Sequence, residues 1–325
     1  LIRHLIFAES SQRRLAGVWG ILNTGSLVWL CLASPFLARS GPVSEMPAAD
    51  QAALEEDWRK QDGIGTERVP ATYATAIQRT FERGDLLLRD LEAERAPLRK
   101  QAARWNELRQ EFEKLRKEGA ASGQQPPTAN PLLKAQWEIL WRQVHQLRRE
   151  IVFANPLAAT GPLLFVKQVP SVFSHQLTQY YGSCARPGGG VFVLDRPGQS
   201  LQARALAAGA LPPGSYQHPE VSFDGQRVLF AYCHAETTPR DRESNLDRFY
   251  HLYEMAADGT GLRQLTDGPY DDFSPRYLPN GELLFISTRR GGYHRCGRGP
   301  CPTYTLAKAQ GDGSNPHSIS YHETH

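Results

Sequence analysis

Tyr250–Tyr304, YHLYEMAADGTGLRQLTDGPYDDFSPRYLPNGELLFISTRRGGYHRCGRGPCPTY, has the pattern of nearly one complete unit of an antiparallel β-repeat. Its first seven residues, Tyr250–Ala256, alternate as a half-buried strand requires. The turn that follows is rich in Asp and Gly, which tolerate positive φ. A short return strand is expected at 262–265. The apolar run at 283–286 then predicts a buried strand over Glu282–Ser287.

The same phrase occurs once before in the chain. His218–Gly225 followed by Gln226–Tyr232 matches Ser274–Gly281 followed by Glu282–Thr288, at a distance of 56 residues. A near-constant period with a turn-rich strand cluster in each unit is typical of a β-propeller. The turn and blade residues expected to define the units are Asp224, Gly225, Asp258, Gly259, Asn280 and Gly281.

The chain as given begins at Leu1 and stops at His325, where a further repeat opens. We therefore expect a partial propeller over residues 160–325, incomplete at its C-terminus. The net charge of +3 is too small and too evenly mixed with acids to indicate nucleic-acid binding. Phosphate-binding, dinucleotide-binding and HExxH motifs are absent from the sequence, and so is any evident Ser-His-Asp order.

Residues 15–38 form the one uncharged segment of membrane-spanning length, and Arg13 and Arg14 precede it. The pattern predicts an N-terminal signal peptide or membrane anchor over residues 1–39, and the choice between them stays open. Either one predicts an exported protein, periplasmic or anchored facing the periplasm. Residues 40–72 are expected to be a polar linker.

Residues 73–155 have a helical pattern. Leu91, Leu98, Trp105 and Phe112 fall seven apart, which predicts a coiled-coil-like seam. A second helix is expected from Asn130, as N-cap, to about Phe153. The two elements form a helical hairpin or short bundle, which either self-associates or folds back on the β-region. The fold class is therefore multidomain, α then β.

The strand-rich part resembles a known family. Segments 163–194, 221–233, 258–293 and 301–306 are similar to the hydrazine synthase alpha-subunit-like family, over about residues 132–325. The most specific features are RRGGY followed by CPTYTL, and LTDGxxxDFxP. The resemblance implies an exported protein with TolB/WD40-like propeller repeats, of the kind found in planctomycete-type bacteria.

The resemblance also implies a cofactor question. The family's name comes from a multihaem enzyme that joins nitric oxide and an ammonia-derived nitrogen, with a metal and a cysteine ligand beside its catalytic haem. Haem c or zinc is thus implied by resemblance alone, because no cofactor is evident from the residues. None of the five cysteines lies in CxxCH, so we expect no covalent haem within residues 1–325.

Cys296 and Cys301 flank a short loop, and His294 precedes them. In an exported protein such a pair predicts a local disulfide. The alternative is metal ligation by one or both cysteines with His294, because thiolate and imidazole suit zinc. Cys233 is expected to be a buried thiol, and Cys184 either pairs with it or is also buried.

Other polar residues are better explained by structure than by chemistry. His218 is expected to cap a turn. Asp271 and Asp272 with Arg289 and Arg290 are expected to lock blades through ion pairs and hydrogen bonds. The remaining histidines considered as metal ligands are His175, His234, His322 and His325.

Two functions follow from these observations. The first is a non-enzymatic propeller scaffold that binds a protein, a glycan or another small molecule. The alternative is a haem- or metal-dependent redox enzyme or subunit related to hydrazine synthase, with its haem motifs beyond these residues. The sequence leaves open whether the protein is an enzyme. A propeller fold alone does not decide activity.

Overall fold

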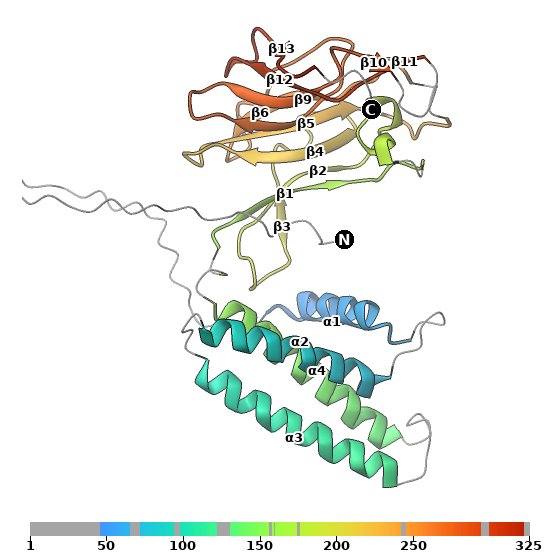
Figure 1. The fold of residues 1–325 in the computed structure, drawn as a ribbon, viewed down its shortest axis with the longest axis vertical. Coiled ribbons are helices and arrows are strands. Elements are labelled where there is room, and N and C mark those ends of the chain that lie inside the picture. The colour runs from blue at the N-terminus through green and yellow to red at the C-terminus, as the bar shows by residue number, and fades with distance from the viewer. Residues whose placement is uncertain are drawn as a thin grey trace, which may run out of the picture. The chain divides into compact units, whose positions relative to one another are not determined.

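Four helices come first in the computed structural model, and antiparallel sheets follow (Figure 1). The described residues all fall in the unit Arg39–His325. They are 46–65, 72–93, 98–121, 131–155, 158, 160–173, 176–241, 245–293 and 299–321. The helices are α1 (Ala48–Asp62), α2 (Tyr73–Ala93), α3 (Arg99–Ala121) and α4 (Pro131–Phe153). This α-then-β order confirms the coarse fold class expected from the sequence.

Helices α2, α3 and α4 share one apolar core. The predicted seam residues are buried in it, and edge-to-face ring pairs join Phe81 to Trp105 at 4.9 Å and Phe112 to Trp137 at 5.8 Å. Gly84 of α2 lies directly under the Trp105 ring, where any Cβ would collide with it. The structure shows a bundle, and it does not support a coiled coil.

The linker expected at 40–72 contains a helix, α1. Its sequence has no apolar stripe, so helical periodicity could not reveal it. Contacts with the other helices hold it in place. Trp58 stacks on His145 at 4.9 Å, and the Asp62 carboxylate accepts hydrogen bonds from Trp141 Nε1 at 2.8 Å and shares one with His145 Nε2 at 2.8 Å. Helices with little amphipathicity are stabilised mainly by such tertiary contacts.

The strands form three larger antiparallel sheets and one small hairpin. The first sheet has the order β1-β2-β3, with β1 (Leu163–Gln168), β2 (Gly189–Leu194) and β3 (Ala203–Ala205). The second, called sheet B below, has the order β4-β5-β6-β7, with β4 (Gly214–Val221), β5 (Arg227–His234), β6 (His251–Ala256) and β7 (Arg263–Gln264). The third, called sheet C, comprises β8 (Asp272–Tyr277), β9 (Leu283–Ser287), β12 (Thr305–Ala309) and β13 (His317–Ser318) in that order. The hairpin pairs β10 (Gly292–Tyr293) with β11 (Pro300–Cys301).

Sheets B and C repeat each other in detail. Their first strands carry a bulge at the same place, where His218 has φ 48° and Ser274 has φ 52°, each followed by proline. A positive φ is uncommon for a residue with a side chain, so its recurrence marks a repeated backbone. In the last turns, Thr260 N donates to Asp258 Oδ1 at 2.9 Å and Ser314 N donates to Asp312 Oδ1 at 2.9 Å.

The period is not uniform, which corrects one detail of the sequence alignment. Sheet B pairs Val228 with Met255, and sheet C pairs Leu283 with Ala309. The second strands are therefore offset by 55 residues and not by 56, because the first turn of sheet B has one more residue than that of sheet C. The third and fourth strands are offset by 54 residues.

Each face of sheet B packs on a different neighbour. Val228 and Phe230 pack with Val191 and Val193 of the three-stranded sheet. The opposite face, with Leu229 fully buried, packs on sheet C. Two consecutive four-stranded sheets are shown, and a closed propeller is not. None of the described helices is long and apolar enough to cross a membrane, and the predicted anchor at 15–38 lies outside the described residues.

Candidate functional site

A cavity of about 440 Å³ lies over one end of sheet B. The face of the sheet that packs on Val191 and Val193 continues past Phe230 and forms the floor of this cavity. The loop between β5 and β6 forms its wall. The lining residues are Tyr232, His234, Glu236, Thr237, Asp247, Arg248, Phe249, His251, Tyr253 and Gln264. A concave site with aromatic rings and a few convergent polar groups is typical of small-molecule binding.

Hydrogen bonds hold the walls of the cavity in place. The Tyr253 hydroxyl donates to Gln264 Oε1 at 2.8 Å, and the two tyrosine rings of the floor meet edge to face at 5.3 Å. The Tyr232 hydroxyl donates to the Pro212 carbonyl at 2.8 Å. Arg248 donates to the backbone and side-chain oxygens of Thr237 at 3.1 and 3.2 Å, which ties the two ends of the wall loop together. The site is therefore preorganised.

The cavity offers both donors and acceptors. Burial lowers the pKa of His251, and Arg289 lowers it further, so its imidazole is neutral near pH 7. Its Nδ1 is buried and has no hydrogen-bond partner among the residues that the structure describes. His234 Nε2 lies 3.5 Å from Glu236 Oε1 at the exposed rim. A buried ring nitrogen without a partner costs free energy that a ligand could recover.

The residues of the cavity floor are those that differ between the two repeats. Register places Tyr232 opposite His251 in sheet B and Ser287 opposite Thr305 in sheet C. The same comparison matches Tyr253 with Ala307, because each lies opposite a buried Phe, and Gln264 with Ser318. Large aromatic and polar side chains of sheet B thus correspond to small ones in sheet C. Scaffold positions such as the bulge do not change in this way.

The predicted turn residues lie where the sequence placed them, away from the cavity. Gly225 and Gly281 have φ 71° and 84° in the first turns of sheets B and C. Gly259 has φ 92° in the last turn of sheet B, next to Asp258. In the first turns, Asp224 Oδ1 accepts from Gln226 N at 3.0 Å and Asn280 Oδ1 accepts from Glu282 N at 3.2 Å. These residues shape the strand connections.

Asp272 and Arg289 form a buried ion pair at the base of sheet C. Arg289 Nη2 donates to both carboxylate oxygens of Asp272, at 3.0 and 2.8 Å, and its Nε donates to Ser287 Oγ at 2.9 Å. Asp272 is fully buried. The pair joins the first and second strands of one sheet, so its geometry is that of a structural contact.

The cysteine and histidine site could be followed only in part. Cys301 is buried in β11, whereas Cys296 and His294 lie outside the described residues. In the part of the chain that the structure describes, no group of three or more His, Cys, Asp or Glu side chains could hold a metal. The disulfide and the metal site therefore stay predictions. Cys233 is a buried thiol, as expected, and Cys184 is buried too.

His218 has a packing role in the structure. Its ring stacks on Tyr180 and on Phe273, with centroids 5.8 Å away in each case, and so bridges the first strands of the two sheets. Burial lowers its pKa to about 4, with a contribution from Arg276. His175, His322 and His325 lie outside the described residues.

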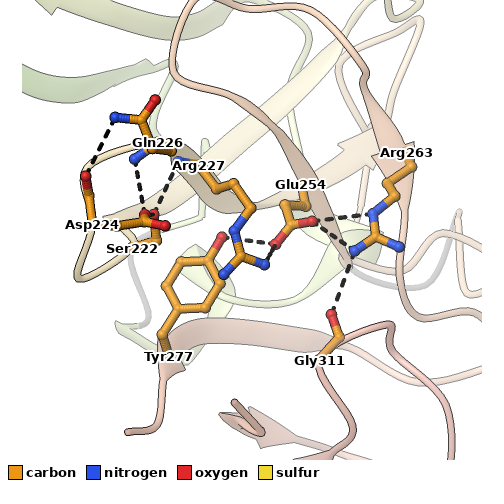
Figure 2. Close-up of polar contacts among 8 residues, drawn as sticks. All are labelled: Ser222, Asp224, Gln226, Arg227, Glu254, Arg263, Tyr277 and Gly311. Atoms are coloured by element: carbon orange, nitrogen blue, oxygen red, sulfur yellow. Dashed lines mark hydrogen bonds and ion pairs between the residues drawn. The ribbon is translucent and has the colours of Figure 1, made fainter.

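A buried carboxylate that the sequence did not reveal connects sheets B and C (Figure 2). Glu254 of β6 is 4% exposed. It accepts from Arg227 at 3.3 Å, from Arg263 at 3.1 and 2.7 Å, and from the Tyr277 hydroxyl of sheet C at 2.9 Å. Arg227 also lies over the Tyr277 ring, 5.2 Å from its centroid. The network locks the two sheets together.

Asp271 has a second structural role that was only partly expected. Its Oδ1 accepts from the backbone nitrogens of Gly182 and Tyr250, both at 2.9 Å, and so fastens the short 3₁₀ turn Gly182–Cys184 to both sheets. Burial raises the pKa of Asp271 to about 7. A Cβ on Gly182 would lie 2.6 Å from Phe249 Cα, so the turn lies directly against the cavity's wall loop.

Comparisons with known proteins give a distant structural link and no family. No family model and no curated protein matches the chain. Among solved structures, it is similar to Kuenenia stuttgartiensis hydrazine synthase, with 20% identity and a TM-score of 0.33. The match covers 46% of this chain and 21% of that chain. A likeness at this level does not carry an activity across. Haem, zinc, export and partners remain expectations from the sequence.

Proposed function

We propose that the β-region is a ligand-binding module and that its ligand occupies the cavity over sheet B. One observation carries the proposal. The floor positions Tyr232, His251, Tyr253 and Gln264 depart from their counterparts in sheet C, while turns, bulges and ladders are repeated. A repeated scaffold that differs at one concave site is the expected arrangement when the site has a separate task.

The ligand that fits best is a small hydroxylated molecule, of the size of a mono- or disaccharide. The cavity volume of about 440 Å³ lies within the range of small-molecule sites. Tyr253 supplies an aromatic ring, and Gln264, His251, Glu236 and Asp247 supply hydrogen-bonding groups. Mixed donors and acceptors of this kind suit hydroxyl groups, each of which both donates and accepts. The charges of Glu236 and Asp247 disfavour a strongly anionic ligand.

We further propose that sheets B and C are blades of a propeller. Support comes from their equivalence, since Leu229 and Leu252 on the outer face of sheet B are fully buried under sheet C. The corresponding Leu284 and Leu306 of sheet C are only partly covered, with Leu306 43% exposed. A further sheet of the same kind would cover them. Electron microscopy or crystallography of a longer chain that contains these residues would test this.

The binding proposal is tested by ligand-induced stabilisation. The full chain is titrated with a panel of mono- and disaccharides while its melting temperature is recorded, and hits are measured by calorimetry. We expect at least one sugar to bind saturably and His251→Ala to weaken it at least tenfold. The matched control is His317→Ala, because His317 is exposed and lies in β13 of sheet C. The absence of any saturable binder, or equal effects of both variants, would contradict the proposal.

A further inference from the structure

Three arginines of the helical bundle lie together without an acidic partner. They are Arg79 and Arg83 on one face of α2 and Arg148 on α4. Elsewhere in the bundle arginines pair with carboxylates, as Arg59 does with Glu138 and Arg142 does with Glu55. Within the described ranges, no ion pair involves any of the three. The Nε atoms of Arg79 and Arg148 are buried and have no hydrogen-bond partner there.

The packing of the helices brings the three side chains together. Thr80 Oγ1 of α2 lies 3.4 Å from His145 Nε2 of α4. Arg83 and Arg148 each come three residues later, and the charge of Arg83 lowers the pKa of Arg148, which burial has already lowered. Arg79 Nη2 donates to the Asp62 carbonyl at 2.8 Å at the end of α1. The cluster therefore lies where α1, α2 and α4 meet.

The nearest carboxylate does not neutralise this charge. Asp62 Oδ2 is already engaged by Trp141 Nε1 and His145 Nε2, each at 2.8 Å. A half-buried guanidinium next to a second one is unfavourable unless an anion accepts its hydrogen bonds. Arg83 is exposed, so the cluster is accessible from solvent. These features distinguish it from ordinary surface arginines, which are solvated or paired.

We propose that Arg79, Arg83 and Arg148 form a binding site for a phosphate group, separate from the cavity over sheet B. Phosphate fits because guanidinium forks donate two parallel hydrogen bonds to its oxygens. Three forks can together satisfy one tetrahedral dianion. The buried Nε atoms of Arg79 and Arg148 are donors that such a ligand can reach once the side chains adjust. The phosphate belongs either to a free small molecule or to a lipid headgroup.

The test uses the full chain and inorganic phosphate as the probe. Phosphate is titrated against melting temperature at constant ionic strength, with chloride as the balancing anion. We expect a saturable rise that Arg148→Gln and Arg83→Gln each weaken at least tenfold. The control is Arg89→Gln, which removes the same charge from an exposed position of α2. Circular dichroism checks that each variant is folded, and exposed Arg83 gives an informative variant even if Arg148→Gln is unstable.

A second measurement separates the two sources of phosphate. The chain is sedimented with phosphatidylcholine vesicles that contain or lack phosphatidic acid. Co-sedimentation that requires phosphatidic acid and is lost in Arg83→Gln assigns the site to a lipid headgroup. Saturable binding of inorganic phosphate without co-sedimentation assigns it to a soluble ligand. If neither occurs, or if Arg89→Gln behaves like Arg83→Gln in both experiments, the proposal is overturned.

Discussion

Sheets B and C share a backbone but not the use made of it. The bulges at His218 and Ser274, the first turns and the last turns recur in both sheets. An ion pair joins equivalent positions of the second and third strands with its charges reversed: Arg227 with Glu254 in sheet B, and Glu282 with Lys308 in sheet C. What differs is burial and the floor of the cavity. The comparison teaches that the repeat specifies the scaffold, and that the departures from it indicate function.

The largest expected effect distinguishes the two ion pairs. Glu254 is 5% exposed in its side chain and is covered by sheet C. Glu254→Ala leaves two arginines and a tyrosine hydroxyl without their acceptor. We expect a loss of about 2–4 kcal/mol, below the full cost of an uncompensated buried charge because both arginines are half-exposed. Urea unfolding measures it.

The control for this prediction is the equivalent pair in sheet C. Lys308→Ala is expected to cost clearly less, because Lys308 and Glu282 are both more exposed than Glu254. Glu254→Gln keeps an acceptor and is expected to fall between the two. Equal losses for Glu254→Ala and Lys308→Ala would show that coverage by the next sheet does not matter.

The contact between the 3₁₀ turn and the cavity's wall loop gives the next largest effect. Gly182→Ala puts a methyl group against the backbone of Arg248 and Phe249, and overpacking of this kind costs about 1–3 kcal/mol. Because the wall loop must move, ligand binding is expected to weaken as well. Gly291→Ala is a useful control for backbone strain, since Gly291 has a positive φ of 67° and open space around it. Unchanged stability in Gly182→Ala would contradict the described packing.

Asp271 gives a pH-dependent difference. Its equivalent in sheet B is Ser215, which does not titrate. Because burial raises the pKa of Asp271 from 3.8 to about 7, the folded state holds this proton where the unfolded state has lost it. Its contribution to stability is full below pH 3.8 and is lost as the pH rises towards 7. Wild type should therefore lose stability relative to Asp271→Asn between about pH 4 and pH 7.

This difference is measured by chemical unfolding of both proteins at several pH values. The comparison with Asp271→Asn cancels the opposite effects of His218 and His251, whose lowered pKa values destabilise the folded state in acid. The charged groups around Asp271 that must stay constant are Asp272 and its partner Arg289. A constant stability difference across the range would show that Asp271 stays ionised.

The smallest expected effect concerns the last turns, where the sheets agree. Asp258→Ala and Asp312→Ala each remove one acceptor for a backbone N–H at 2.9 Å in an exposed turn. We expect small and equal decreases in melting temperature. Unequal decreases would mean that the two turns are less alike than their hydrogen bonds indicate.

Much of the scaffold could be predicted from the sequence. The strand over Glu282–Ser287 and its earlier counterpart were found from apolar runs and Asp-Gly or Asn-Gly turns, and α4 was found from its apolar stripe and Pro131. Helix α1 was not, because contacts of Trp58 and Asp62 hold it and no periodicity marks it. The propeller itself, the signal or anchor and the metal site stay predictions.

The candidate site was harder to predict than the scaffold. His234 was considered, but only as a metal ligand, and Tyr232, Tyr253 and Glu254 were taken as ordinary strand residues. Only strand register shows that Tyr253 corresponds to Ala307, since the offset changes along the repeat from 56 to 55 and then to 54. Once that register is known, the departure from the repeat is the signal that marks the site.

The most direct test gives sheet B the floor of sheet C. The triple variant His251→Thr, Tyr253→Ala and Gln264→Ser places the residues of β12 and β13 at the equivalent positions of the cavity. We predict a folded protein with an unchanged helical and sheet content by circular dichroism, and loss of the saturable sugar binding measured by calorimetry in wild type. Sugar binding of wild-type affinity in the folded triple variant would contradict the assignment of function to this cavity.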